Sequence, residues 1–176
     1  MDVFEAIAAR RSIRAFDDKP LNDDVLERIL DAARLAPSGS NRQPWRYVVV
    51  GDEQMRGKLA RASADQMFVA EAPVVVVACC YPAPPDSDRG GWMGRYGALL
   101  DAAIGLDHIQ LAAYALGVAS CWIGSFDAEA VRKLLGVPED VWVVGLMPLG
   151  YPAERPAPTS RLPMKEIVCR GKWAFG

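Results

Sequence analysis

The sequence predicts a single soluble domain, residues 1–176, that mixes helices with buried strands. Its length of 176 residues suits one domain and is enough to bury a sizeable core. Apolar residues make up 51% of the chain and charged residues 24%, as in ordinary globular proteins. Apolar residues recur at helical spacing in some segments and form short β-branched runs in others, so both kinds of element are expected.

Five segments have the apolar spacing of helices. Asp2 with Glu5 matches a capping box, and Asn22 precedes an acidic first turn. The fourth segment is apolar nearly all round, which is typical of a helix buried in a core or in a subunit interface. The predicted helices are residues 2–10, 23–36, 53–66, 97–116 and 127–135.

Four strands are predicted, at residues 46–50, 74–80, 119–124 and 141–149. The second is a continuous apolar run and is expected to be buried on both faces of a sheet. The long segment that follows it, through Tyr96, combines Pro and Gly with aromatic residues, so residues 82–96 are expected to form a lid. The tail is rich in proline yet ends in apolar residues, which predicts an arm that packs on another surface.

Composition excludes several classes of protein. The net charge of −2 argues against nucleic acid or an anionic membrane as the main partner, and no apolar run is long enough for a membrane span. The N-terminus has acidic residues and does not resemble a signal peptide. Four cysteines without a C-x-x-C pair predict reduced thiols in a cytoplasmic protein and no metal site.

One histidine, His108, is too few for most histidine metal sites and catalytic triads. It is expected to be structural or at an interface, with a place near the functional site as the alternative. Any chemistry therefore needs a cofactor or carboxylates.

The first predicted helix ends in a basic cluster. Arg10, Arg11, Ser12 and Arg14 lie within five residues. Guanidinium groups and a hydroxyl suit a phosphate dianion, because each guanidinium can donate two parallel hydrogen bonds. The alternative is a solvated helix end whose charge complements the helix dipole. No G-x-G-x-x-G follows a strand and no P-loop occurs, so neither nucleotide-binding motif is supported.

Four motifs in order resemble the FMN-dependent nitroreductase family, especially its shorter members. The resemblance covers essentially the whole chain. The motifs are Arg10-Arg11-Ser12-x-Arg14, Pro37-Ser38-Gly39-Ser40-Asn41-x-Gln43-Pro44-Trp45, Cys121-Trp122-Ile123-Gly124 and Leu149-Gly150-Tyr151-Pro152. The resemblance implies an α+β fold with a central, mostly antiparallel sheet flanked by helices. It also implies a homodimer with FMN at the interface and a C-terminal arm that packs on the partner subunit.

The resemblance also implies which residues bind the cofactor. Arg10, Arg11 and Ser12 match positions that hold the FMN phosphate and ribityl chain, and Arg14 matches the cation that gives electrostatic support at the pyrimidine edge of the flavin. The loop given by the second subunit contains Pro37, Ser38, Gly39, Asn41 and Gln43. The segment running past the flavin ring is Cys121, Trp122, Ile123 and Gly124.

The end of the chain leaves the phosphate contacts open. Arg161 resembles a late basic residue that returns to the phosphate, but Thr159 stands where the family often has lysine. Arg170 and Lys172 could instead complete that pocket. In residues 60–70, Gln66 is the candidate for a contact at the flavin edge.

The implied activity is that of an FMN-dependent NAD(P)H oxidoreductase. NADH or NADPH would give a hydride to flavin N5, and a small flat acceptor such as a nitroaromatic or a quinone would take two electrons in a second half-reaction. The cofactor carries this chemistry, so no catalytic acid, base or metal from the protein is expected. The alternatives are dehalogenation or O2-dependent chemistry on the same fold, and a flavin-binding dimer without turnover.

Overall fold

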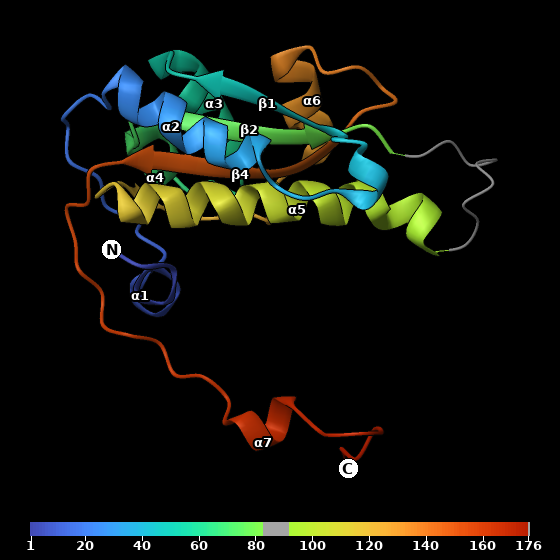
Figure 1. The fold of residues 1–176 in the computed structure, drawn as a ribbon. Coiled ribbons are helices and arrows are strands. Elements are labelled where there is room, and N and C mark those ends of the chain that lie inside the picture. The colour runs from blue at the N-terminus through green and yellow to red at the C-terminus, as the bar shows by residue number, and fades with distance from the viewer. Residues whose placement is uncertain (83–91, 176) are drawn as a thin grey trace.

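A four-stranded antiparallel sheet forms the middle of the molecule (Figure 1). The structure is a computed structural model that describes residues 1–82 and 92–175, without the side chains of residues 92–95. The strand order is β1-β2-β4-β3, and every neighbouring pair is antiparallel. The predicted α+β fold is therefore confirmed. The strands are β1 (Trp45–Val50), β2 (Val74–Cys80), β3 (Ala119–Ser120) and β4 (Trp142–Gly150).

Strand β2 is central and almost wholly buried, as predicted from its β-branched run. It pairs with β1 from Val50↔Val75 to Trp45↔Cys80, and with β4 from Val74↔Leu149 onward. Its side chains alternate between the two faces of the sheet, so this one strand contributes to two separate cores.

Helices cover both faces of the sheet. On one face α2 (Asp23–Arg34) and α5 (Trp92–Ala115) pack on Val76 and Ala78 through residues such as Ile29 and Ile109. On the other face α3 and α6 pack on Val75 and Val77 through Leu59 and Val131, and α4 adds Val69. The bounds of these three helices are Glu53–Ala62 for α3, Phe68–Glu71 for α4 and Ala128–Leu135 for α6.

Short helix α1 (Val3–Ala9) packs against α5 outside the sheet layers. The predicted capping box is present, since Asp2 Oδ1 accepts from Glu5 N and Glu5 Oε2 accepts from Asp2 N, both at 2.9 Å. Asn22 Oδ1 likewise caps α2 by accepting from Val25 N. These local signals fix where the helices begin.

Three predicted boundaries differ most from the structure and were wrong by four residues or more. The strand expected over 119–124 ends at Ser120, and the chain then returns to the sheet only where Ile123 pairs with Leu146. Helix α3 ends at Ala62 because Ala64 and Asp65 both have a left-handed φ of 55°. Helix α5 begins at residue 92, so the end of the expected lid is helical, and residues 83–91 lie outside the described residues.

After β4 the chain runs as an extended arm away from the body, with α7 (Met164–Ile167) before the C-terminal residues (Figure 1). The apolar residues of the arm are exposed, with Trp173 at 80%. Helix α1 also exposes apolar side chains, with Phe4 at 79%. No helix in the described ranges is both long and apolar enough to cross a bilayer.

Candidate functional site

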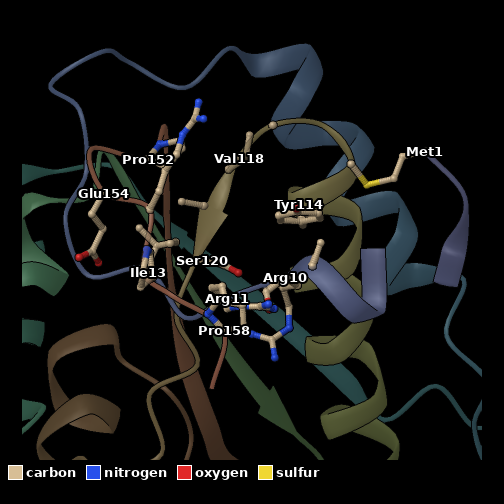
Figure 2. A pocket seen from close by; sticks show the side chains of 15 residues that line it. Met1, Arg10, Arg11, Ile13, Tyr114, Val118, Ser120, Pro152, Glu154 and Pro158 are labelled. Atoms are coloured by element: carbon tan, nitrogen blue, oxygen red, sulfur yellow. The ribbon is translucent and has the colours of Figure 1, made fainter. Parts of the chain in front are cut away.

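A cavity of about 460 Å³ lies between the end of α1, the C-terminal part of α5, strand β3 and the start of the arm (Figure 2). This volume falls in the range of small-molecule and cofactor sites. Arg10 and Arg11 line it just after α1, Tyr114 from α5 and Ser120 from β3. The arm adds Arg155 and prolines, so the cavity joins parts of the chain that are distant in sequence.

The N-terminal segment is fixed beside the edge of the sheet. Ser12 pairs with Ser120 in a parallel bridge, and Ile13 N donates to Ser120 O at 3.0 Å. Arg14 N donates to Glu154 Oε1 at 2.5 Å. These bonds hold the basic cluster between β3 and the chain that leaves β4, so the backbone that carries the arginines has a defined position.

The three arginines of the cavity form no ion pair within the described structure, although Glu154 also lines the cavity and accepts from Arg14 N. Among the described residues, no carboxylate oxygen lies within 4.0 Å of a guanidinium nitrogen of Arg10, Arg11 or Arg155. Arg11 Nη1 donates to the carbonyl oxygens of Ala8 and Arg10, at 2.8 and 2.7 Å. Three guanidinium groups around one cavity favour an anionic ligand such as a phosphate.

Ser12, Arg14 and Cys121 lie together, as the sequence motifs imply. Burial raises the pKa of the Cys121 thiol, and the charge of Arg14 and a hydrogen bond with Ser12 oppose that shift. The guanidinium of Arg14 also stacks on the ring of Phe68, 5.9 Å from its centroid. Gln66 Nε2 donates to Ser125 O at 3.3 Å, so Gln66 contacts the residue that directly follows Gly124.

In the segment after β3, Cys121 and Ile123 are buried and Gly124 is exposed. Ile123 N donates to Leu146 O at 2.8 Å, and Leu146 N donates back at 3.2 Å. The Trp122 indole lies so close to Gly145 that a Cβ there would be 2.8 Å from Nε1. The segment is therefore anchored on β4 and leaves Gly124 at the surface.

The second polar cluster is a loop built around a 3-10 turn, η1 (Gly39–Asn41). Asn41 and Gln43 have left-handed φ values of 54° and 51°, which are uncommon for residues other than glycine. Ser38 Oγ accepts from Gln43 N at 3.0 Å. Pro37 is exposed at the start of this loop, whereas Pro44 is buried at its end.

The two polar clusters lie at different ends of α5 (Figure 1). Gly39 is bonded to Asp101 near one end, while Tyr114 lines the cavity with Arg10 and Arg11 near the other. Tyr114 lies thirteen positions after Asp101 on α5, or about 20 Å at 1.5 Å per residue. One chain therefore does not bring Asn41 and Gln43 to its own basic cluster.

Arg161 does not line the cavity. Its Nη1 donates to Thr159 Oγ1 at 2.6 Å and to neighbouring carbonyl oxygens on the exposed arm. Arg170 and Lys172 are likewise exposed on the arm. The cavity instead contains Arg155, a residue that the sequence analysis did not identify.

Arg155 lies three residues after Pro152 of the Gly150-Tyr151-Pro152 motif, and that position close to an identified motif was the signal that could have found it. Phe68 and Tyr114 were also missed. Aromatic residues at helical spacing are usually core residues, so the sequence offered no sign of their contacts with the site.

The fold and the basic cavity define a cofactor-binding α+β protein, and comparisons with known proteins identify the family. The sequence pattern of the nitroreductase family matches residues 7–83 and 66–151. A Methanothermobacter thermautotrophicus protein, provisionally named an NADH dehydrogenase/NAD(P)H nitroreductase, is 36% identical over 160 residues, covering 89% of this chain and 80% of its own. The NADPH-flavin oxidoreductase of Vibrio harveyi is 31% identical, covering 95% and 72%.

The structural comparison agrees. The NADPH:FMN oxidoreductase of Vibrio harveyi, solved in complex with NAD+, has a TM-score of 0.89 and 30% identity, and the match covers 98% of this chain and 78% of that one. The chain belongs to the nitroreductase family.

Proposed function

We propose that this protein is an FMN-dependent NAD(P)H oxidoreductase that works as a homodimer and reduces small flat acceptors such as nitroaromatics or quinones. An oxidoreductase that uses flavin and NAD(P)H follows from the family and from relatives named as NAD(P)H-flavin oxidoreductases and FMN reductases. The acceptors, the two-step hydride transfer and the dimer are our proposal.

The observation that carries the proposal is the arginine cluster around the cavity. Arg10, Arg11 and Arg155 face a space of about 460 Å³ without a carboxylate within 4.0 Å in the described part of the chain. A phosphate dianion would satisfy these donors, so the residues present fit the terminal phosphate of FMN. Ser12 follows Arg11 in the chain and is exposed, with its hydroxyl bonded to the Cys121 thiol.

The separation of the two polar clusters supports a dimer. In a twofold dimer each interface patch meets its own copy, so a cluster at one end of α5 can lie beside the cluster at the other end of the partner's helix. Exposed apolar residues on α1 and on the arm supply surface for such an interface, including Phe4, Ile7 and Trp173. We therefore propose that Pro37, Ser38, Gly39, Asn41 and Gln43 complete the FMN site of the other subunit.

Within this proposal the protein binds and orients while the cofactor reacts. FMN, when bound, supplies hydride acceptance and donation at N5. Arg14 keeps its positive charge close to Cys121 and would favour negative charge on the pyrimidine edge of a ligand held there. The segment from Cys121 to Gly124 is held by β4 and would run along the flavin ring. Arg161, Arg170 and Lys172 are exposed on the arm and do not line the cavity of their own chain.

The four cysteines are all free, which fits the reducing environment of the cytoplasm that we expect for this protein.

Cofactor titration tests the proposal most directly. The protein, stripped of any bound flavin, should quench the fluorescence of added FMN with a stoichiometry of one per chain. NADH or NADPH should then bleach the flavin absorbance, and a nitroaromatic or quinone should restore it. Absence of any spectral change on adding FMN would refute the cofactor assignment. Bleaching without restoration by any acceptor would support the alternative of a flavin-binding dimer without turnover.

A further inference from the structure

We propose that Asp101 is a positioning residue whose buried carboxylate holds residues 37–43 in the conformation that completes the FMN site of the partner subunit. The second half of this statement rests on the proposed function. That Asp101 fixes the loop concerns one chain alone and can be tested without FMN.

Asp101 is unusual because it is a buried acid. It lies on α5 with 8% of its surface exposed, and it is the one buried carboxylate among the residues whose burial is described. Among the described side chains no cation lies within 4.0 Å of it. A buried charge without a partner cation is costly, so the hydrogen bonds it accepts must offset its loss of hydration.

Its carboxylate accepts from the backbone of the polar loop. Both oxygens lie within reach of Gly39 N, at 3.2 and 3.3 Å. On the other side of the same residue, Arg42 Nε donates to Gly39 O at 3.2 Å. Gly39 is thus held through its N–H by Asp101 and through its carbonyl by Arg42.

The residues that follow Gly39 need such an anchor. Ser40, Asn41 and Gln43 have φ values of 53°, 54° and 51°. Left-handed backbone at residues other than glycine is unfavourable, and it persists where the surrounding structure determines it. Bonds within the loop include those from Gln43 N to Ser38 Oγ at 3.0 Å and from Gln43 Nε2 to Asn41 Oδ1 at 3.2 Å. Asp101 connects it to a rigid 24-residue helix.

The hydrogen bond between Gly39 N and Asp101 matters for a ligand because it fixes the loop that carries Asn41 and Gln43. Asn41 and Gln43 carry exposed polar side chains whose direction depends on the strained backbone. If Gly39 is released, the loop can relax and these side chains leave their places. Because the loop lies about 20 Å along α5 from its own basic cavity, the loss would be felt at the cavity of the other chain.

Three variants test the positioning role. Asp101→Ala removes the acceptor, Asp101→Asn keeps a side-chain oxygen that can accept from Gly39 N, and Asp107→Ala removes an exposed acid from the same helix as the control. We expect Asp101→Ala to raise the Kd for FMN about ten- to hundredfold, as for loss of a hydrogen bond to a charged group. The Kd of Asp101→Asn for FMN should stay within about threefold of the wild-type value. The Kd of Asp107→Ala should equal the wild-type value.

Hydrogen–deuterium exchange of the apoprotein provides a readout that does not involve FMN. Residues 38–43 should exchange faster in Asp101→Ala but not in Asp101→Asn. Should Asp101→Ala fail to fold, Arg42→Ala acts on the same peptide from the surface and should also speed exchange there. Unchanged exchange and unchanged Kd in the alanine variants, or equal losses in the alanine and asparagine variants of Asp101, would overturn the inference. A wild-type protein that binds no FMN would refute the proposed function and leave the exchange result standing.

Mixed dimers decide which site the loop serves. Consider a dimer of one Asp101→Ala chain and one Arg11→Ala chain. If the loop held by Asp101 completes the partner's FMN site, both substitutions affect the same site and the other site stays intact. One tight FMN per dimer is then expected. If Asp101 acts on its own chain's cavity, each site carries one lesion and no tight site is found.

Discussion

At the scale of single residues, the arginines around the cavity differ from the two arginines that form ion pairs in the described structure. Arg34 and Arg132 form short ion pairs with Asp31 and Glu129, both at 2.7 Å. Exposed pairs of this kind contribute little to stability. Arg10, Arg11 and Arg155 lack such a carboxylate partner in the described structure and are thus available to a ligand.

Arg11→Ala should weaken FMN binding by about 1.5–3 kcal/mol, because it removes a charged donor to the phosphate. Isothermal titration of the apoprotein with FMN measures this directly. Arg34→Ala is the matched control and should leave the affinity unchanged, since Arg34 lies on the exposed side of α2. Equal affinities for wild type and Arg11→Ala would remove Arg11 from the site.

Buried thiols make stability depend on alkaline pH. Burial raises the pKa of Cys79 and of Cys80 from 9.0 to about 11, and the charge of Asp101 adds to the shift at Cys80. In the unfolded chain these thiols ionise from about pH 9, whereas in the folded chain they stay protonated to about pH 11. Their contribution to the free energy of unfolding is therefore complete below pH 9 and is lost as the pH rises from about 9 to about 11.

We expect the free energy of unfolding in urea to fall between about pH 9 and 11. Lysines and tyrosines also titrate at high pH, so the comparison is with the Cys79→Ala/Cys80→Ala double variant. That variant should be less stable at pH 8, because it leaves a cavity, yet show a shallower pH dependence. If the free energy of unfolding depended on pH equally in the two proteins, the pH dependence could not be assigned to Cys79 and Cys80.

At the scale of elements, sequence and structure agree best where a local rule decides the outcome. The capping residues Asp2, Asn22 and Asp127 and the β-branched run of β2 act through neighbours in the chain, and the corresponding elements were predicted correctly. The end of β3 was missed because the course of the chain after Ser120 is set by pairing of Ile123 with a distant strand. No local pattern encodes such a contact.

The residues of the candidate site also divide into those that local sequence reveals and those that only the fold brings together. The basic cluster and the polar loop were found from their residue types, since charge and turn chemistry are visible in sequence. Arg155 and Asp101 were not assigned to it, because only the fold brings Arg155 beside Arg11 and Asp101 beside Gly39. A lone arginine or aspartate carries no sign of its tertiary neighbour.

Strand β4 ends at a glycine that permits close packing. A Cβ at Gly150 would lie 2.6 Å from Pro73 Cδ and 3.0 Å from Phe16 Cδ1. Gly150→Ala should therefore destabilise the protein by about 1–3 kcal/mol, measured by urea unfolding. Gly57→Ala is the control, because it lies inside α3 with nothing within 4 Å of its Cβ position.

The control should gain up to about 1 kcal/mol from the better helix propensity of alanine. A neutral Gly150→Ala would show that Pro73 and Phe16 move aside at no cost.

At the scale of the whole molecule, the proposed shared site gives a sharp test. Asn41→Ala should weaken FMN binding less than Arg11→Ala, because it removes a neutral donor. In a mixed dimer of an Arg11→Ala chain with an Asn41→Ala chain, shared sites place both lesions together and leave one site native. Titration should then find one tight FMN per dimer, whereas sites built within single chains would give none.

The length of α5 has a consequence for how the cofactor is retained. If each FMN contacts two chains, the cofactor and the partner chain are linked ligands, and each strengthens the binding of the other by the same factor. Dilution of the protein towards its dimer dissociation constant would then release flavin by mass action, and excess FMN would draw separated chains together. The colour of a dilute solution would thus report on its state of assembly.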